Sequence, residues 1–273
     1  MIEKLNALMD MLRAVFHKLL HLPVLAAETS GAPVDNLIIY IHWLMIALFV
    51  GWFGYFVYCL WRFNAKRNPK ADHAGTKSHM STYIEFGVIV AELVLLIGFA
   101  IPMWSQASDV TKIPDADKAT VIQVVGQQFA WNCRYPGKDG KFGKQSMTFV
   151  TSDNPFGVDP NDPDGKDDIQ KNSFAEMHVP INKPVICYVS SKDVIHSFKI
   201  IAMRVTQDAI PGMRIPCWFQ PSKEGRYQIN CAQLCGNGHS TMSSGFVIVE
   251  SHEAYDKWLA SQTPVPAGGG SLE

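Results

Sequence analysis

Two long apolar runs dominate the N-terminal part of the chain. The run 37–61 has no formal charge, and the run 83–104 has only two, on Glu85 and Glu92. As helices they would be about 33–37 Å long, enough to cross a bilayer core of about 30 Å. Buried core helices seldom stay apolar on all faces over this length. The pattern predicts a transmembrane hairpin over 35–104, with helices at about 37–61 and 83–104.

The short connection between these runs sets their orientation. Residues 62–82 contain five Lys and Arg against a single acid, Asp72. Positively charged loops stay on the cytoplasmic side of a membrane. Both flanks of the hairpin, including everything after Trp104, are therefore expected on the outer side.

The rest of the chain reads as short alternating runs separated by Gly, Pro, Asn and Asp. This pattern is typical of an all-β domain, which we expect over 105–262, as a β-sandwich or Greek-key barrel. A short helix is expected at 252–262 and a flexible tail at 263–273. The strand candidates are 119–135, 146–152, 174–180, 184–190, 196–205, 226–233 and 244–251.

The N-terminal segment 1–30 allows two interpretations. Basic residues, an apolar patch and the small residues of VLAAET resemble a signal peptide cleaved near Ala27. His17, Lys18 and His21 interrupt the apolar patch, so the alternative is an amphipathic surface helix that is retained.

Composition removes several function classes. Hydrophobic residues make up 47% of the chain and charged residues 18%, which excludes a mostly disordered protein. The net charge of −1 offers no basic surface for nucleic acid. The acidic segment 153–168 matches an EF-hand loop only in part, because the first ligand position would be Pro160. We interpret it as a surface loop rather than a calcium site.

The segment 231–242, CAQLCGNGHSTM, holds the most informative chemistry. It places two thiols, an imidazole and a thioether close together in the sequence. Thiolate and thioether are soft ligands that, with imidazole, favour copper, whereas zinc sites do not use Met. A single blue-copper ion needs one Cys, two His and a weak axial Met. Cys235, His239 and Met242 supply three of these, and His196 is the candidate for the second His.

Cys231 is one thiol more than a single copper ion requires. Two facing thiolates can bridge two copper ions, with Met242 and the backbone carbonyl of Gln233 as weak ligands. A disulfide between Cys231 and Cys235 and a structural zinc remain alternatives. The other thiols, at Cys133, Cys187 and Cys217, are most simply buried small side chains, and a disulfide among them stays open.

These motifs together resemble subunit II of a haem–copper cytochrome c oxidase. The helix hairpin is followed in family order by GQQFAWNCRYPG (126–137), SKDVIHSF (191–198), QDAIPGM (207–213), CAQLCGNGHSTM (231–242) and GFVIVES (245–251). The resemblance covers about residues 35–262. It implies a cupredoxin domain with a binuclear CuA centre, whose side-chain ligands would be His196, Cys231, Cys235, His239 and Met242, completed by the Gln233 carbonyl.

The function implied by the resemblance is that of an electron inlet. CuA would take electrons one at a time from a c-type cytochrome and pass them to haem in subunit I. Oxygen would be reduced there, with proton translocation, so this chain would not reduce oxygen alone. No C-x-x-C-H motif occurs, so the donor is expected to be a separate protein. The signal-like segment and the outward domain favour a bacterial plasma membrane, with the copper domain in the periplasm.

An intramembrane carboxylate adds a proton route to these expectations. Acids inside membrane helices are costly and often serve proton transfer. Glu85, in STYIEF, matches a family Glu at the entrance of a proton channel; the alternative is that it snorkels to the interface. Glu92 has no firm family equivalent, and a contact with a neighbouring subunit is the weaker hypothesis for it.

The sequence departs from the family at two positions near the expected copper site. Many relatives have Glu at Gln233, where its side chain helps to bind magnesium; Gln lacks the charge, so a standard magnesium site is doubtful. In relatives the first Trp of GxQWxW receives the electron. Phe129 stands at that position here and Trp131 matches the second Trp, so the resemblance implies electron entry through these two residues.

Three other classes of protein match the sequence less well. A structural subunit of the quinol-oxidase type would have lost copper ligands, whereas all five ligand side chains are present here. A single-copper carrier would need neither Cys231 nor Glu85. Nitrous oxide reductase has a similar copper loop, but this chain has no room for its propeller domain.

Overall fold

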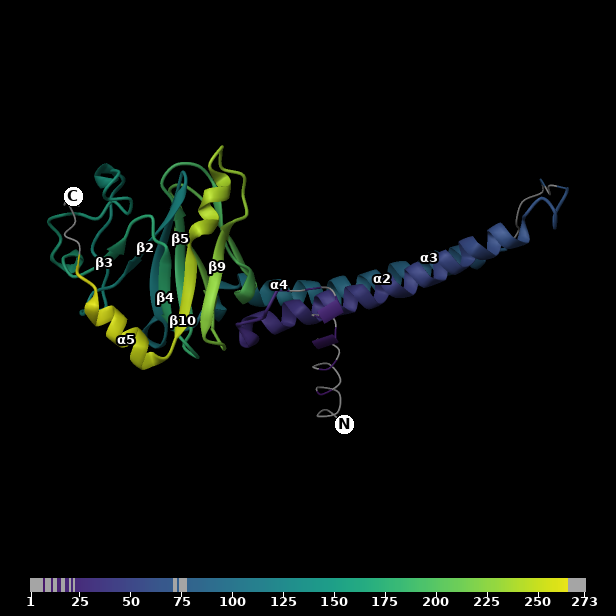
Figure 1. The fold of residues 1–273 in the computed structure, drawn as a ribbon, viewed down its shortest axis with the longest axis horizontal. Coiled ribbons are helices and arrows are strands. Elements are labelled where there is room, and N and C mark those ends of the chain that lie inside the picture. Colours follow the sequence, from purple (N-terminus) through teal and green to yellow (C-terminus); the bar gives the residue numbers. More distant parts are fainter. Residues whose placement is uncertain are drawn as a thin grey trace. The chain divides into compact units, whose positions relative to one another are not determined.

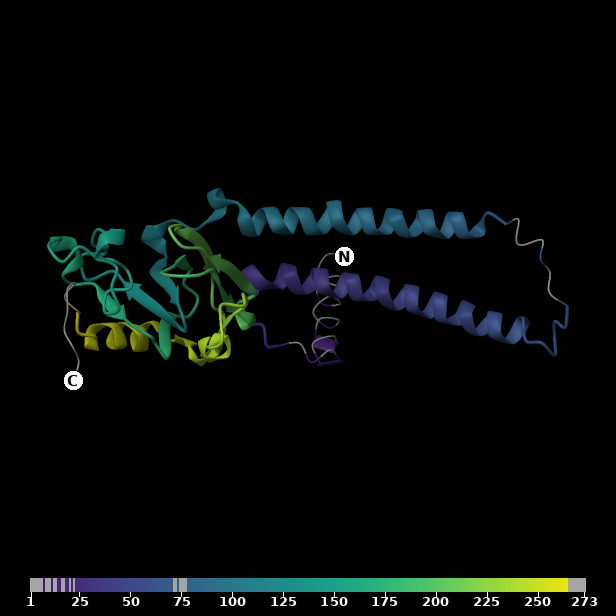
Figure 2. The same cartoon turned by 90° about the horizontal axis from the view of Figure 1, so that it is seen from above.

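The computed structural model describes residues 23–70, 73 and 78–264, together with residues 7, 11, 14, 15, 18, 19 and 21. Most of the predicted N-terminal segment before residue 23, and the tail from residue 265, lie outside the described residues. The chain forms two compact units. Residues 33–108 belong to the first, and residues 23–32 pack with the region that begins at Asp109 to form the second. Figures 1 and 2 show a pair of long helices and a β-sandwich.

The helical unit consists of two antiparallel helices. α2 spans Glu28–Arg62, and α3 (Met80–Leu95) continues through the π-helical turn η1 (Leu96–Ala100) into α4 (Ile101–Ser108). Two helices of this unit are long and apolar enough to cross a membrane, and almost none of the residues in their apolar segments is buried. Exposed apolar faces of this size are stable only against lipid or partner subunits. The transmembrane hairpin of the predicted fold class is therefore confirmed.

These helices extend beyond the apolar runs that predicted them. α2 begins at Glu28, because the polar stretch before the apolar run is also helical. The π-helical turn ends two residues before Pro102, which cannot donate the backbone hydrogen bond expected at its position in the helix. Tyr40 of α2 and Phe99 of the turn pack edge to face, with ring centroids 5.1 Å apart.

The second unit is an all-β sandwich of two five-stranded sheets. One sheet has the order β3-β2-β1-β5-β8 and the other β4-β10-β9-β6-β7. Two pairs, β1 with β5 and β4 with β10, are parallel, as expected when a chain alternates between two layers. The strands are β1 (Thr120–Gln127), β2 (Ala130–Tyr135), β3 (Ile169–Lys171), β4 (Glu176–Pro180), β5 (Val185–Ser191), β6 (His196–Ile200), β7 (Val205–Ala209), β8 (Ile215–Phe219), β9 (Gly225–Cys231) and β10 (Phe246–Glu250).

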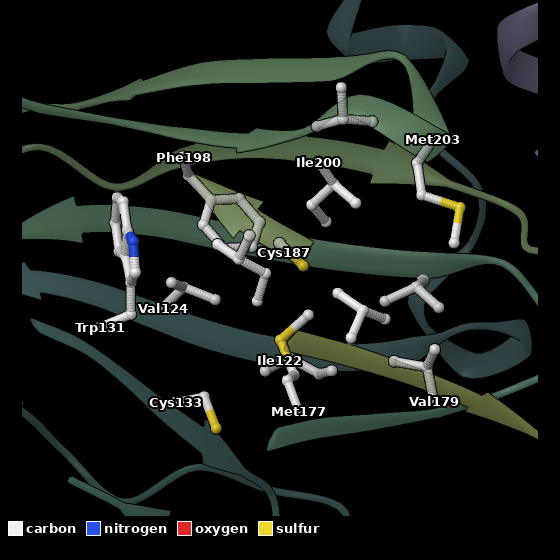
Figure 3. Packing of buried hydrophobic residues seen from close by; sticks show 14 of the residues in the cluster. Ile122, Val124, Trp131, Cys133, Met177, Val179, Cys187, Phe198, Ile200 and Met203 are labelled. Atoms are coloured by element: carbon white, nitrogen blue, oxygen red, sulfur yellow. The ribbon is translucent and has the colours of Figure 1, made fainter. Parts of the chain in front are cut away.

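The core lies between these sheets. Alternate residues of each strand point inward, so that β1 contributes Ile122 and Val124, and β6 contributes Phe198 and Ile200. Figure 3 shows these side chains interdigitating, with Trp131 at one end. Trp131 and Phe198 pack edge to face at 5.2 Å. This close packing fixes the start of β6, at His196, and the end of β9, at Cys231.

Several strand predictions are corrected by the structure. The run 119–135 is not one strand but a hairpin of β1 and β2, in which Gln127 pairs with Ala130. The run 146–152 forms the 3₁₀ helix η4 (Met147–Phe149), not a strand. The run 196–205 ends its strand at Ile200 and passes through a 3₁₀ turn to β7. Strands β3, β7 and β8 were not predicted, apart from the first residue of β7, whereas the predicted C-terminal helix is confirmed as α5 (His252–Ser261).

The acidic segment 153–168 is a surface loop, as interpreted from the sequence, and buried polar contacts hold it in place. The Asp162 carboxylate accepts a hydrogen bond from the Lys144 amide at 2.6 Å. Asp168 forms a buried ion pair with Arg134 and accepts a hydrogen bond from the Gly143 amide. Burial raises the pKa of Asp168 and lowers that of Arg134. The carboxylates of Asp162 and Asp168 thus stabilise the loop through these contacts. Among the described residues, the acids of this segment do not form a group of three or more potential metal ligands.

A short N-terminal segment completes the β-sandwich. Leu25, Ala26 and Ala27 are buried among its residues. The Ala26 amide donates to the Ala202 carbonyl at 2.8 Å, and the Ala26 carbonyl accepts from the Ser222 amide at 2.7 Å. The residues around the predicted cleavage point are thus part of the folded domain.

Candidate metal centre

Three potential metal ligands converge at one end of the sandwich. His196 is the first residue of β6, Cys231 is the last residue of β9, and Cys235 lies four residues further along the chain. Their ligand atoms lie within 4.8 Å of one another, and all three residues are buried. Among the described residues this is the one group of three or more His, Cys, Asp or Glu side chains arranged in this way.

Strand pairing explains the convergence. β6 and β9 are antiparallel neighbours, with Phe198 opposite Cys231. The pairing continues for one bond into the loop, because the Ala232 amide donates to the Ser197 carbonyl at 2.9 Å. His196 and Cys231 therefore sit at the same end of adjacent strands, one at a strand start and the other at a strand end.

The loop after β9 brings the remaining predicted ligands to the same place. Cys235 Sγ lies 3.4 Å from His239 Nδ1 and 3.4 Å from Met242 Sδ. Cys231 Sγ lies 3.1 Å from the Gln233 carbonyl oxygen and 4.0 Å from His196 Nδ1. Ligands bound to one ion at about 2.0–2.3 Å are separated from each other by about 3–4 Å. The spacing of these atoms therefore fits metal ligation.

The electrostatics of the two thiols also suit a cation. Burial, followed by the neighbouring Cys231, raises the pKa of the Cys235 thiol to about 11. Two thiolates this close would repel each other without a positive charge between them. A bound metal ion would remove that penalty and displace the thiol protons. The donor set of sulfur and imidazole is the kind that copper prefers.

Asp193 orients one of the imidazoles, a role that the sequence analysis missed. Its Oδ1 lies 2.8 Å from His196 Nε2 and accepts from the Val194 amide at 2.7 Å. Its Oδ2 accepts from the Gln128 amide at 2.7 Å. Burial acts to raise the pKa of Asp193, but these hydrogen bonds outweigh it and lower the pKa. With Nε2 held by Asp193, Nδ1 of His196 faces Cys231. An Asp three residues before a ligand His was the available signal.

Comparison with known proteins now identifies the family. A family model described as "Cytochrome C oxidase subunit II, periplasmic domain" matches residues 120–251. The "Alternative cytochrome c oxidase subunit 2" of Bradyrhizobium diazoefficiens is 32% identical over 234 residues, which cover 86% of this chain and 82% of that protein. The chain belongs to the cytochrome c oxidase subunit II family.

Another subunit II sequence and a solved structure are also similar to this chain. The "Cytochrome c oxidase subunit 2" of Cereibacter sphaeroides is 29% identical, over 90% of this chain and 81% of that protein. A crystal structure of the periplasmic domain of cytochrome oxidase subunit II from Bradyrhizobium japonicum is 31% identical and covers 55% of this chain and 95% of that chain, with a TM-score of 0.39. This subunit II is thus part of an oxidase, anchored in a membrane with its β-sandwich outside.

The metal cluster is the group of potential ligands formed by His196, Cys231, the Gln233 carbonyl, Cys235, His239 and Met242. Two aromatic side chains of subunit II border it. The Trp131 ring is buried and packs edge to face against His196, with centroids 6.0 Å apart. Phe129 is half-buried and packs on the backbone of the metal loop, where a Cβ added at Gly236 would lie 3.0 Å from its ring. Any side chain at Gly236 or Gly238 would therefore displace this ring.

The predicted proton-channel residue lies in the other unit of subunit II. Glu85 is in α3, five residues after its start at Met80, and its side chain is exposed in this chain. Glu92 lies further along the same helix. The helical unit buries neither acid.

Proposed function

We propose that this chain is the electron-inlet subunit of a respiratory cytochrome c oxidase. It would accept electrons one at a time from a c-type cytochrome and deliver them to haem in subunit I, where oxygen is reduced with proton translocation. The observation that carries the proposal is the cluster of two thiols, two imidazoles, a thioether and a carbonyl. Separations of 3.1–4.0 Å join His196 and the Gln233 carbonyl to Cys231, and His239 and Met242 to Cys235. The ligand atoms of His196, Cys231 and Cys235 lie within 4.8 Å of one another, which brings the two groups together.

We assign these groups as ligands of a binuclear copper centre, CuA. Cys231 and Cys235 would bridge the two ions, with His196 and His239 as the imidazole ligands and Met242 as a weak ligand. The Gln233 carbonyl would be the other weak ligand. A copper pair bridged by two thiolates shares one electron between its ions, which permits one-electron transfer with little change in geometry. Zinc does not account for the Met242 contact.

Hydrogen bonds around the site support fast transfer by holding the ligands in place. Asp193 holds His196 through a hydrogen bond at 2.8 Å and is itself fixed by two backbone amides. Gln128 also donates from its side chain to the Cys235 carbonyl at 2.6 Å. Because both strand ends and the loop are tied together, the ligands need not move when the charge changes.

Phe129 and Trp131 are our candidates for the electron entry. Phe129 packs on the metal loop and Trp131 packs against His196, so each aromatic ring adjoins the ligand set. A phenyl ring replaces the indole of many relatives at the outer position. This difference favours a route in which the ring provides close contact with the donor and Trp131 provides the coupling to the metal.

The position in the cell follows from the helices and their connection. The basic residues of the 62–82 connection favour the cytoplasmic face, which puts the copper domain in the periplasm of a bacterial plasma membrane. Glu85 would then lie near the cytoplasmic end of α3, at the entrance of a proton channel formed with subunit I. Gln233 lacks the negative charge for a standard interface magnesium site, and we propose none.

Reduced c-type cytochrome mixed with the copper-loaded full chain in detergent tests the proposal. We expect rapid oxidation of the cytochrome, accompanied by reduction of one electron equivalent per copper pair. Cys235→Ser should lose this reaction because it removes a bridging ligand. Phe129→Leu should slow it while leaving the copper content unchanged. Its control is Phe142→Leu, since the Phe142 ring lies against Arg134, near the other end of β2. No electron uptake by the loaded wild-type chain would refute the electron-inlet function.

A further inference from the structure

A second pair of cysteines lies in the β-sandwich, apart from the metal cluster. Cys187 of β5 and Cys217 of β8 are directly opposite each other on antiparallel strands. Cys187 is fully buried and Cys217 is half-buried. All six cysteines have free thiols in the structure. The assigned function uses Cys231 and Cys235 only, so it does not explain why two further thiols face each other.

The strand pairing places these two residues within disulfide range. Directly opposite residues of antiparallel strands have Cα atoms about 4.5–5.5 Å apart. Disulfides join Cα atoms that are about 4.4–6.8 Å apart. The Cβ atoms of such pairs are about 4.5–5.5 Å apart, against about 3.5–4.5 Å in a disulfide, so the strands must approach by up to about 1 Å. Closure therefore needs a small local adjustment and no rearrangement of the sheet.

The third core thiol, Cys133, is not a competing partner. It pairs with Val124 of β1, whereas Cys187 pairs with Ile122 of β1. β2 and β5 are two strands apart, which separates their backbones by about 9.5 Å. That exceeds the range of a disulfide. Figure 3 shows Cys133 and Cys187 in separate parts of the core, projecting from different strands.

The metal thiols are equally out of reach of this pair. Cys187 lies in one sheet and Cys231 ends a strand of the other. Facing sheets are about 10 Å apart. A disulfide between Cys187 and Cys231 would therefore need the two sheets to approach each other, which the close-packed core between them opposes.

Cys187 and Cys217 differ in burial, and this difference determines which thiol an external disulfide would meet first. The Cys217 thiol, followed by burial, raises the pKa of Cys187 well above its ordinary value. Cys217 lies on an edge strand and is partly exposed. An external reagent would thus reach Cys217 first, and Cys187 would act as the resolving thiol.

We propose that Cys187 and Cys217 form a cross-strand redox site that closes to a disulfide in the oxidising compartment outside the membrane. The oxidant is an external disulfide. The Cys217 thiolate attacks one of its sulfurs and releases one thiol, and Cys187 then attacks the mixed disulfide and releases the second. Two protein thiols lose two electrons and two protons, and the external disulfide becomes two thiols.

The disulfide would constrain the part of the β-sandwich that contains His196. The closed ring runs from Cys187 through the Asp193 loop, β6 and β7 to Cys217, and so contains His196. Edge strand β8 would be joined covalently to β5. Oxidation would therefore tie down the segment that positions His196 without consuming a metal ligand.

The test uses the copper-loaded full chain in detergent, incubated with a series of glutathione buffers of rising disulfide content. The sample is quenched in acid, unfolded, treated with an alkylating reagent and analysed by peptide mass spectrometry. We expect a linked Cys187–Cys217 peptide that increases with the disulfide content and disappears with dithiothreitol. Cys133 should be alkylated throughout, as the internal control for a buried thiol outside the pair.

Two variants make the result specific. In Cys217→Ser, Cys187 should become alkylated at all buffer ratios; in Cys133→Ser, the linked peptide should form as in the wild type. Full alkylation of Cys187 and Cys217 in the wild-type chain at the most oxidising ratio would overturn the proposal. Because that measurement needs no variant, a folding defect in either variant does not affect it. Recovery of Cys187 linked to Cys133 would overturn it equally.

Discussion

Replacing Asp193 by Ala should weaken copper binding without unfolding the β-sandwich. The carboxylate accepts three hydrogen bonds, from His196 Nε2 at 2.8 Å, the Val194 amide at 2.7 Å and the Gln128 amide at 2.7 Å. Without it, the His196 ring is free to turn and Nδ1 no longer faces Cys231. Copper binding would then have to order the His196 ring, which reduces the free energy of binding.

The size of the effect follows from the bond to the ligand His. A hydrogen bond to a charged group contributes about 1.5–3 kcal/mol. Loss of a carboxylate that orients a metal-bound His costs about 10–100-fold in affinity, or about 1.4–2.8 kcal/mol. Asp193→Ala should therefore lower copper affinity by about 10–100-fold. Asp193→Asn should fall between it and the wild type, because one amide oxygen can still accept from His196.

Competition titration against a copper chelator measures this affinity directly. Asp208→Asn is the matched control, since Asp208 is an exposed acid on β7. The melting temperature of each copper-free variant separates a positioning role from a structural one. Wild-type copper affinity in Asp193→Ala would refute the orienting role of Asp193, and an equal loss in Asp208→Asn would attribute the effect to net charge.

Three other substitutions test separate parts of the account. Arg134→Met should destabilise the β-sandwich by about 3–5 kcal/mol in denaturant unfolding, because it leaves Asp168 as an uncompensated buried charge; a double variant with Asp168→Leu should recover part of this loss. Leu25→Ala should cost about 2–3 kcal/mol by the same measurement, since Leu25 is 4% exposed in the sandwich. Glu85→Gln should slow oxygen turnover of the assembled oxidase while the copper content stays unchanged.

Each of these has a control in the same chain. Val24→Ala, at a neighbouring residue that is 62% exposed, should leave stability unchanged. An equal effect at Val24 and Leu25 would contradict docking of the N-terminal segment. Glu92→Gln is the control for Glu85, and normal turnover in Glu85→Gln would favour snorkelling of that carboxylate to the interface. A double Arg134 variant no more stable than the single one would contradict the buried-charge explanation.

The metal cluster was predictable because its residues are chemically unusual and close in sequence. Cys231, Cys235, His239 and Met242 all belong to the segment 231–242, so a single loop brings them together. His196 required knowledge of strand pairing, since its proximity to Cys231 comes from the register of β6 and β9. His196 was predicted from the sequence as the second His ligand, and the structure supplies the geometry that brings it to Cys231.

Other features depended on information that local patterns do not carry. The 119–135 run alternates apolar and polar residues in the manner of a strand, and neither residue between Gln127 and Ala130 is a Gly or Asn that would mark a turn. The 146–152 run resembles a strand, but it lies in a region whose loops are held by the buried pair of Arg134 and Asp168. The opposition of Cys187 and Cys217 is a matter of register alone. Each of these features depends on contacts between residues far apart in the sequence, which a local sequence pattern does not show.

The proposed electron-inlet function requires two copper ions that share the ligands of the metal cluster. The full chain in detergent should be loaded with copper under reducing conditions, partly oxidised, and examined by metal analysis and electron paramagnetic resonance together. We predict two copper ions per chain and a hyperfine pattern from one electron shared by both nuclei. A single copper ion with splitting from one nucleus, or a chain that binds no copper, would contradict the account.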